Sequence, residues 1–145
     1  MSNSYISFDL LPSDPLIPLG AEVWINQEKI FDTDSMTELA KIRYEFVDNS
    51  EQQYCLRIVL KNKQPGHTKI DTDGNITSDS MIVAQNFELE EIDITHIVHD
   101  KMQYQHDFNG SGNTVTEKFY GALGCNGIAS MTFFTPIYVW LLDQM

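Results

Sequence analysis

Two loops rich in Asp, Asn and Gly hold the residues best suited to bind a cation. In the first loop, Asp71-Thr72-Asp73-Gly74-Asn75 is followed by Asp79. Ca²⁺ takes about six to eight oxygen ligands, and side chains at alternate positions around a Gly can supply them. The loop matches an EF-hand only in part, because it has no Glu at the twelfth position and no helix is expected on either side. A plain hairpin turn at Asp73-Gly74 is the alternative interpretation.

The second loop, residues 106–113, also gathers side-chain oxygens around two Gly. If the fold brings both loops to one end of the domain, their oxygens could form a single calcium site. Alternatively, the Asp and Asn residues only supply left-handed backbone positions in turns. The candidate calcium ligands are Asp71, Asp73, Asn75, Asp79, Asp107 and Asn109.

Aromatic side chains beside the second loop are candidates for contact with a sugar. Tyr104 and Phe108 flank this loop, and their rings could stack on a sugar or pack in the core. Asn113 adds a further side-chain oxygen from the same loop. The candidate ligand-binding residues are therefore Tyr104, Phe108 and Asn113.

Three histidines are the remaining candidates for catalysis. His96 and His99 would share one face of a helix, and together with His106 they could hold Zn²⁺. The HExxH motif is absent, however, and Asp100 is adjacent to a histidine instead of being placed as a base. Serine-hydrolase, nucleotide-binding and kinase motifs are also absent. We therefore expect a non-enzymatic protein without catalytic residues, and a metal-dependent hydrolase is kept as an alternative.

Alternating apolar and polar residues predict that strands position these loops. Residues 39–47 and 54–61 alternate over their whole length around a polar turn, which predicts an antiparallel hairpin. Turn signals at a spacing of about 8–12 residues predict an all-β, antiparallel, jelly-roll-like β-sandwich of about eight or nine short strands. Residues 136–145 suit a strand or a short helix equally.

The first 20 residues differ from the remainder of the chain. Pro12, Pro15 and Pro18 recur every third residue, which predicts an extended conformation. We expect residues 1–20 to form an extended arm, which packs on its own domain or reaches a neighbouring subunit. Residues 21–145 are expected to form a single β-sandwich domain, since the 145-residue length suits one domain.

Charge and cysteine content exclude several classes of protein. The net charge of -12 repels phosphate backbones and anionic lipids, so we expect neither nucleic-acid nor membrane binding. Cys55 and Cys125 are expected to be free thiols. The N-terminal stretch contains no basic residue and no continuous apolar run, so we expect no signal peptide and synthesis in a cytoplasm.

Several short motifs resemble one group of viral proteins. IDTDGNITSDSMIV at 70–83, HDFNG at 106–110, FYGALGCNG at 119–127 and the C-terminal TPIYVWLLDQM are similar, in their order, to small uncharacterised proteins of tailed cyanobacterial phages. The resemblance covers about residues 67–145 and implies a phage-encoded β-sandwich without assigned catalytic residues. A looser similarity to calcium-dependent carbohydrate-binding modules rests on Asp71, Asp73, Asp107 and Asn109.

These observations lead to one expected function and one alternative. We expect a non-enzymatic structural or binding module of a phage virion, such as a capsid decoration, tail or host-adhesion component. Its expected partners are other virion proteins, further copies bound through the N-terminal arm, or a cell-surface glycan. We expect it to be made in the host cytoplasm and to reside in the virion. The alternative is a calcium-dependent carbohydrate-binding domain, with calcium as the candidate cofactor.

Overall fold

Sheet A is built around β1 (Asn3–Pro12), in which every second side chain from Ser4 to Leu10 is buried. The computed structural model describes residues 3–48, 51–108 and 110–144. The strand order is β12-β8-β1-β4, with β9 added to β8, and all pairings are antiparallel. The other members are β4 (Ala40–Val47), β8 (Ile82–Leu89), β9 (Ile92–Asp93) and β12 (Ala122–Leu123).

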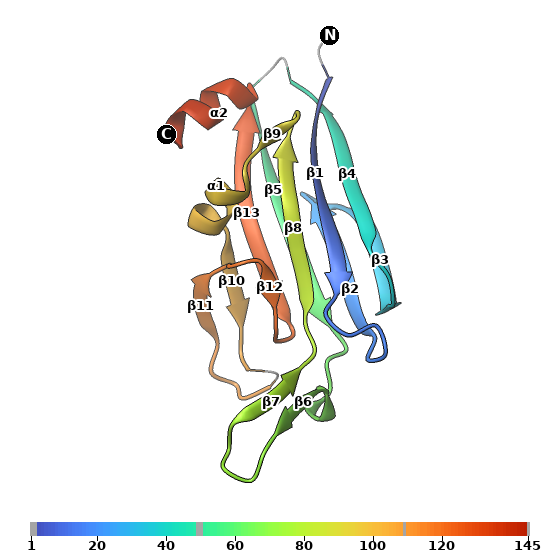
Figure 1. The fold of residues 1–145 in the computed structure, drawn as a ribbon. Helices are drawn as coiled ribbons and strands as arrows, with labels where there is room; N and C mark the ends of the chain where they lie inside the picture. The colour runs from blue at the N-terminus through green and yellow to red at the C-terminus, as the bar shows by residue number, and fades with distance from the viewer. Residues whose placement is uncertain (1–2, 49–50, 109, 145) are drawn as a thin grey trace.

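Sheet B has the order β11-β10-β13-β5-β2-β3 and is also antiparallel (Figure 1). Its members are β2 (Leu19–Ile25), β3 (Glu28–Met36), β5 (Gln52–Lys61), β10 (Gln103–His106), β11 (Val115–Lys118) and β13 (Gly127–Thr135). A separate hairpin of β6 (Thr68–Ile70) and β7 (Ile76–Asp79) follows the 3₁₀ turn Pro65–His67 and projects below the sandwich in Figure 1. The predicted all-β sandwich is confirmed, with 13 strands among the described residues where eight or nine were expected.

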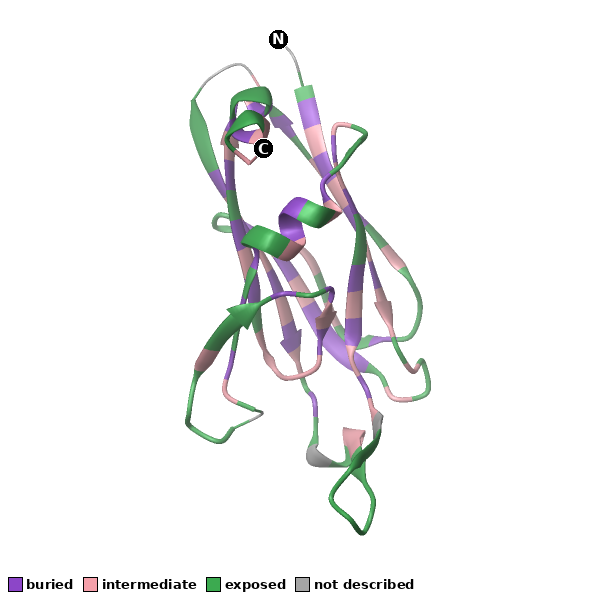
Figure 2. Cartoon of the chain, turned by 60° about the vertical axis from the view of Figure 1, so that its left-hand side comes forward, coloured by how far each residue is buried: buried purple, intermediate pink, exposed green. Residues whose placement is uncertain are grey.

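The core lies between the two sheets, because most of the long strands bury one of their two faces. Buried positions alternate with intermediate or exposed ones along several of the strands in Figure 2. Phe8 stacks on Phe87 within sheet A, with ring centroids 4.9 Å apart. Phe46 of sheet A meets Phe133 of sheet B at 5.5 Å. Burial of this apolar surface, at about 25 cal/mol per Å², is the main term that stabilises the sandwich.

Within the segment expected to form an extended arm (residues 1–20), residues 3–12 form a strand inside sheet A, so this part packs on its own domain. β1 pairs with β4 on one side and with β8 on the other. Pro12 ends this strand, and Pro15 and Pro18 lie in the following loop. The period-two burial of β1 identifies a strand, and the prolines mark only where that strand stops.

The predicted hairpin of residues 39–47 and 54–61 is wrong in its pairing. Both segments are strands and bury the predicted faces, but β4 pairs with β1 in sheet A. β5 pairs instead with β2 and β13 in sheet B. Alternation shows which face of a strand is buried, and either layer of a sandwich can bury such a face. The pattern therefore fixes the face of each strand but not its partner.

Two short helices complete the fold. α1 (Thr95–Lys101) follows β9, and α2 (Ile137–Asp143) shows that the C-terminal segment is a helix where the sequence left helix and strand open. The Ile137 N–H at the start of α2 donates to Asp48 Oδ1 at 2.9 Å, which satisfies one of the free amides of the first turn. Neither helix is long and apolar enough to cross a membrane, and the described residues contain no other α-helix.

Candidate functional site

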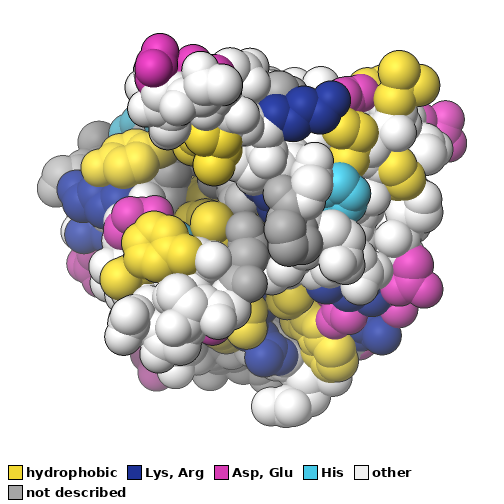
Figure 3. Space-filling model, turned by 90° about the horizontal axis from the view of Figure 1, so that it is seen from below, with side chains coloured by type: hydrophobic (Ala, Val, Ile, Leu, Met, Phe, Trp, Pro, Cys, Tyr) yellow, Lys and Arg dark blue, Asp and Glu magenta, His cyan; other side chains and the backbone are white. Residues whose placement is uncertain are grey.

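Four connections meet at one end of the sandwich, which we call the loop end (Figure 1). They are the β1–β2 loop (13–18), the β6–β7 hairpin (68–79), the β10–β11 loop (107–114) and the β12–β13 turn (124–126). Figure 3 views the molecule from this end and shows hydrophobic side chains among charged ones. Both Asp/Asn/Gly loops of the sequence therefore lie at the same end of the domain.

The first of these loops forms the tip of the β6–β7 hairpin, where Asp71 organises the backbone. One carboxylate oxygen, Asp71 Oδ1, accepts the N–H groups of Asp73 and Asn75, both at 2.9 Å. Gly74 has a φ of 86°, which only a residue without a Cβ adopts freely. The carboxylates of Asp71 and Asp73 are exposed. Asp71 Oδ1 thus closes the turn at the tip of the hairpin.

Asp79 lies at the base of the same hairpin and neutralises a buried lysine. Its Oδ1 contacts the Lys63 ammonium group and accepts the Thr68 hydroxyl at 2.7 Å. The Lys63 side chain is 1% exposed and also donates to the carbonyl of Gly124. The Lys63 backbone N–H donates to Asn126 Oδ1 at 2.9 Å, and the Asn126 side-chain amide donates to the Lys63 carbonyl at 3.0 Å. This cluster ties the hairpin to the sandwich, and sequence reasoning missed Lys63 because a single lysine carries no pattern.

The β10–β11 loop is closed by Asp107 in a similar way. Asp107 Oδ1 accepts the Gly110 N–H at 2.9 Å, and its carbonyl accepts the N–H of Ser111 at 2.9 Å. The Asn113 N–H donates to Ser111 Oγ at 3.2 Å, and the Asn113 side chain is exposed. Asn109, a further calcium candidate, lies outside the described residues.

The two aromatic candidates beside this loop have opposite environments. Tyr104 is buried, and its hydroxyl donates to the Cys125 carbonyl and accepts the Cys125 N–H at 2.9 Å. Burial raises the pKa of the Tyr104 hydroxyl above its ordinary value. Phe108 is 58% exposed, with a φ of 56°. Of the two rings, only Phe108 is accessible to a ligand at the loop end.

Cys125, whose backbone is bonded to the Tyr104 hydroxyl, is half-buried. Burial raises the pKa of the Cys125 thiol, and the nearby Lys63 ammonium offsets part of this shift. A raised pKa keeps the thiol protonated at neutral pH, so its arrangement does not favour nucleophilic chemistry.

The histidines are separated by the fold. His96 and His99 lie on α1, whereas His106 is buried on β10. The Phe108 N–H donates to His106 Nδ1 at 3.3 Å, so His106 Nε2 carries the proton and donates to Glu117 Oε1 at 3.0 Å. In the described part of the chain, no three His, Cys, Asp or Glu side chains are grouped to hold a metal ion. Within the described residues, neither the candidate zinc histidines nor the carboxylates of the loop end are therefore brought together into such a group.

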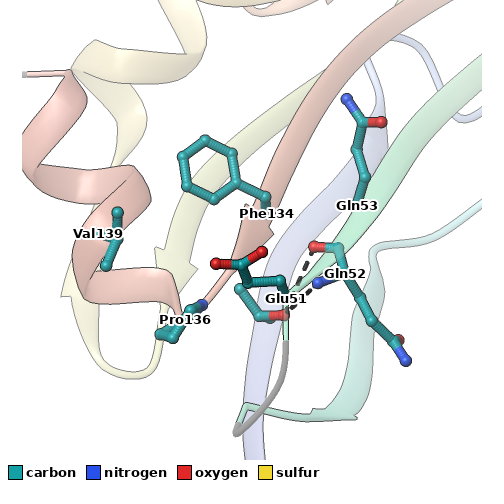
Figure 4. A pocket seen from close by; sticks show the side chains of 7 residues that line it. Glu51, Gln52, Gln53, Phe134, Pro136 and Val139 are labelled. Carbon is teal, nitrogen blue, oxygen red and sulfur yellow. Dashed lines mark hydrogen bonds between the residues drawn. The ribbon is translucent and has the colours of Figure 1, made fainter.

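Two hollows lie away from the loop end, around α2. The first, of about 450 Å³, is lined by Glu51, Gln52, Gln53, Phe134, Thr135, Pro136 and Val139 (Figure 4). The Gln52 N–H already donates to Thr135 Oγ1 at 3.1 Å, which ties β5 to the end of β13.

The second hollow, which we call the α1–α2 groove, is apolar. It has a volume of about 440 Å³ and is lined by Ile92, Asp93, His96, Ile97, Tyr138, Leu141 and Leu142. Leu142 is 69% exposed and Tyr138 is 61% exposed. These side chains come from the C-terminal helix, from α1 and from β9, so the groove is a composite surface that no single motif of the sequence reveals.

No family model, curated protein or solved structure matches this chain.

Proposed function

We propose that the chain is a non-enzymatic structural or binding module of a phage virion, acting as a capsid decoration, tail or host-adhesion component. The motif resemblance over residues 67–145 supports the phage assignment. The α1–α2 groove is the observation that carries the binding role. It exposes Tyr138 and Leu142 in a chain whose net charge of -12 otherwise favours a hydrated surface. Contiguous exposed apolar surface is characteristic of protein contacts.

The partners we propose are other virion proteins or further copies of the chain. β1 is already paired on both sides within its own sheet, so residues 3–12 are engaged without a neighbouring subunit. The proposed contact therefore lies on the α1–α2 groove instead of on an N-terminal arm. Nucleic acid and membrane remain outside the proposal because of the acidic charge.

The test measures how much of the chain travels with phage particles. Particles are separated on a density gradient, and copies of the chain are counted by mass spectrometry. We expect Leu142→Glu to lower the copies per particle at least tenfold, because it places a charge in the groove. Leu16→Glu is the matched control, since Leu16 is 89% exposed in the β1–β2 loop. Recovery of the chain only in the soluble fraction, or equal copies of Leu142→Glu and unaltered protein, contradicts the proposal.

The second candidate function is calcium-dependent carbohydrate binding at the loop end. It is favoured by the placement of both Asp/Asn/Gly loops at one end, beside the exposed ring of Phe108. A ligand at about 100 times its Kd stabilises a fold by about 2.7 kcal/mol, which raises Tm by several degrees. This candidate requires such a rise in Ca²⁺ but not in Mg²⁺, and its loss in Asp73→Ala. Equal Tm values in Ca²⁺ and EDTA would exclude it.

A further inference from the structure

A polar groove crosses the outer face of sheet A, over β4, β1 and β8. We call it the sheet A groove; its polar lining residues are Ser7, Asp9, Lys41, Arg43, Asn86, Glu88 and Asp93. Ser7 lies at the centre, directly opposite Arg43 on one side and Glu88 on the other. Its short side chain leaves space between two long ones. The hollow has a volume of about 520 Å³, within the range of about 300–1,000 Å³ usual for small-ligand sites.

A β-bulge in β8 shapes one wall of this groove. The register between β1 and β8 shifts between Ser7 and Asp9, so β8 carries one extra residue there. Asn86 lies in the bulge with a φ of 59°, in the left-handed region. Its side-chain amide donates to Asp9 Oδ2 at 2.9 Å across the strands. Bulges re-aim side chains and are common beside binding sites, where backbone strain is also concentrated.

The two walls carry opposite charges. Lys41 and Arg43 project from β4, whereas Glu88 and Asp93 face each other on β8 and β9. Among the described residues, neither Lys41 nor Glu88 forms a side-chain hydrogen bond or ion pair. Two carboxylates placed directly opposite each other repel, so this pair costs stability in the free protein. The groove therefore holds polar groups whose bonding capacity the fold leaves unused.

Arg43 adds an aromatic component at the rim. Its guanidinium carbon lies 3.8 Å from the ring centroid of Tyr5, the outward-facing residue two positions before Ser7. The stacked pair holds the guanidinium in place while its N–H groups still face polar partners such as Glu45 at 3.1 Å. An ordered donor loses less conformational entropy when it binds a ligand than a freely rotating one does.

We propose that the sheet A groove binds a neutral saccharide through its hydroxyl groups, without calcium. A hydroxyl group both donates and accepts, so one sugar can bond to the basic wall and to the acidic wall together. A ligand with a net charge of one sign would be attracted to one wall of the groove and repelled by the other. The Asp9 carboxylate can accept from one hydroxyl of a sugar ring, and the adjacent Asn86 amide can bond to the neighbouring hydroxyl of the same ring. This inference goes beyond the proposed function and depends on neither the α1–α2 groove nor the loop end.

A glycan array of neutral and acidic saccharides, probed with the full chain in EDTA, tests the proposal. We expect binding to neutral saccharides in EDTA. Ser7→Trp fills the floor of the groove, and Asp9→Ala removes its central acceptor, so each should weaken binding at least tenfold. Ser130→Trp is the matched control, because Ser130 faces outward from sheet B.

The outcomes separate this inference from the proposed function. Binding to none of the arrayed saccharides, loss of binding in EDTA, or full binding by both Ser7→Trp and Asp9→Ala would overturn it. Should Ser7→Trp fail to fold by circular dichroism, Asp9→Ala alone decides. Particle association is measured independently, with Leu142→Glu, and is expected to be unchanged in Asp9→Ala. Failure of sugar binding thus leaves the virion proposal standing, and failure of particle association leaves the groove standing.

Discussion

The loop end and the sheet A groove contain the same kinds of polar residue, but the fold uses them differently. At the loop end, Asp71 and Asp107 accept backbone N–H groups of their own turns, and Asp79 neutralises Lys63. In the sheet A groove, Lys41 and Glu88 face outward without such partners among the described residues. The comparison teaches that residue type identifies a possible ligand group, whereas hydrogen bonds already made decide whether that group is available.

Asp79→Leu gives the sharpest test of a structural role at the loop end. The substitution leaves the Lys63 ammonium group buried without a counter-charge and removes the acceptor of the Thr68 hydroxyl. Breaking a buried pair by removing one partner costs about 3 kcal/mol or more. We therefore expect the free energy of unfolding in urea to fall by about 3 kcal/mol, equally in EDTA and in Ca²⁺.

The double variant Lys63→Met/Asp79→Leu is the control. It removes both charges, so it should recover part of the stability that Asp79→Leu loses. A loss seen only in Ca²⁺ would break the comparison, because Asp79 would then act as a metal ligand.

Tyr104→Phe tests whether the buried aromatic candidate is a core residue. The variant leaves the Cys125 N–H and carbonyl without their partner, which should cost about 1–2 kcal/mol of unfolding free energy at neutral pH.

The pH dependence of the same variant has a defined sign. Burial raises the pKa of Tyr104 in the folded state, so its contribution is complete below the unfolded pKa of about 10 and is lost as pH rises above it. Urea unfolding at about pH 8 and about pH 11 should therefore show a smaller alkaline loss in Tyr104→Phe. Tyr44 and Tyr54, whose pKa values burial also raises, maintain the remaining loss. An unchanged alkaline loss would show that the Tyr104 hydroxyl is not buried in the folded state.

Asp71→Ala and Asp73→Ala form a matched pair within one turn. Asp71 accepts two backbone N–H groups, so its removal should cost about 1 kcal/mol and lower Tm by about 3 °C in EDTA. The exposed Asp73 side chain makes no hydrogen bond in the described structure, and Asp73→Ala should change stability by less than about 0.5 kcal/mol. Equal losses in thermal melts of the two variants would show that Asp71 does not organise the turn.

The sequence predicts the sandwich because alternation is a local signal. The inward faces of β4 and β5 follow directly from their residues. The partner of β4 does not follow, because strands of either sheet bury an equivalent apolar face. β1 was not predicted as a strand for a different reason. Pro12, Pro15 and Pro18 mark the end of the strand and the loop after it, and the buried positions of the strand include a polar residue, Ser4.

For the candidate sites too, a local motif can be recognised from the sequence, whereas a site built from distant strands cannot. Asp71-Thr72-Asp73-Gly74-Asn75 is recognisable as a turn or a cation loop from sequence, and the structure adds which oxygen the turn uses. The sheet A groove combines Ser7, Arg43 and Glu88 from strands far apart in the chain. Their juxtaposition depends on sheet order and on a one-residue bulge, and neither is encoded in a local pattern.

Glu88→Gln is expected to have the smallest effect and tests the groove side of the comparison. Glu88 lies directly opposite Asp93 in the β8–β9 pair, so the substitution removes a like-charge contact on an exposed face. The Asp93 carboxylate is held by the Thr95 N–H at 2.8 Å, which keeps the pKa of Asp93 below its ordinary value and Asp93 ionised near neutral pH. We expect Glu88→Gln to be neutral or to raise the free energy of unfolding by up to about 0.5 kcal/mol in urea at pH near 7. At a pH below the pKa of the Asp93 carboxylate, the difference should disappear, because Asp93 is then uncharged and the like-charge contact is gone. A loss of more than about 1 kcal/mol would instead mean that Glu88 has a structural partner, and the groove would then resemble the loop end.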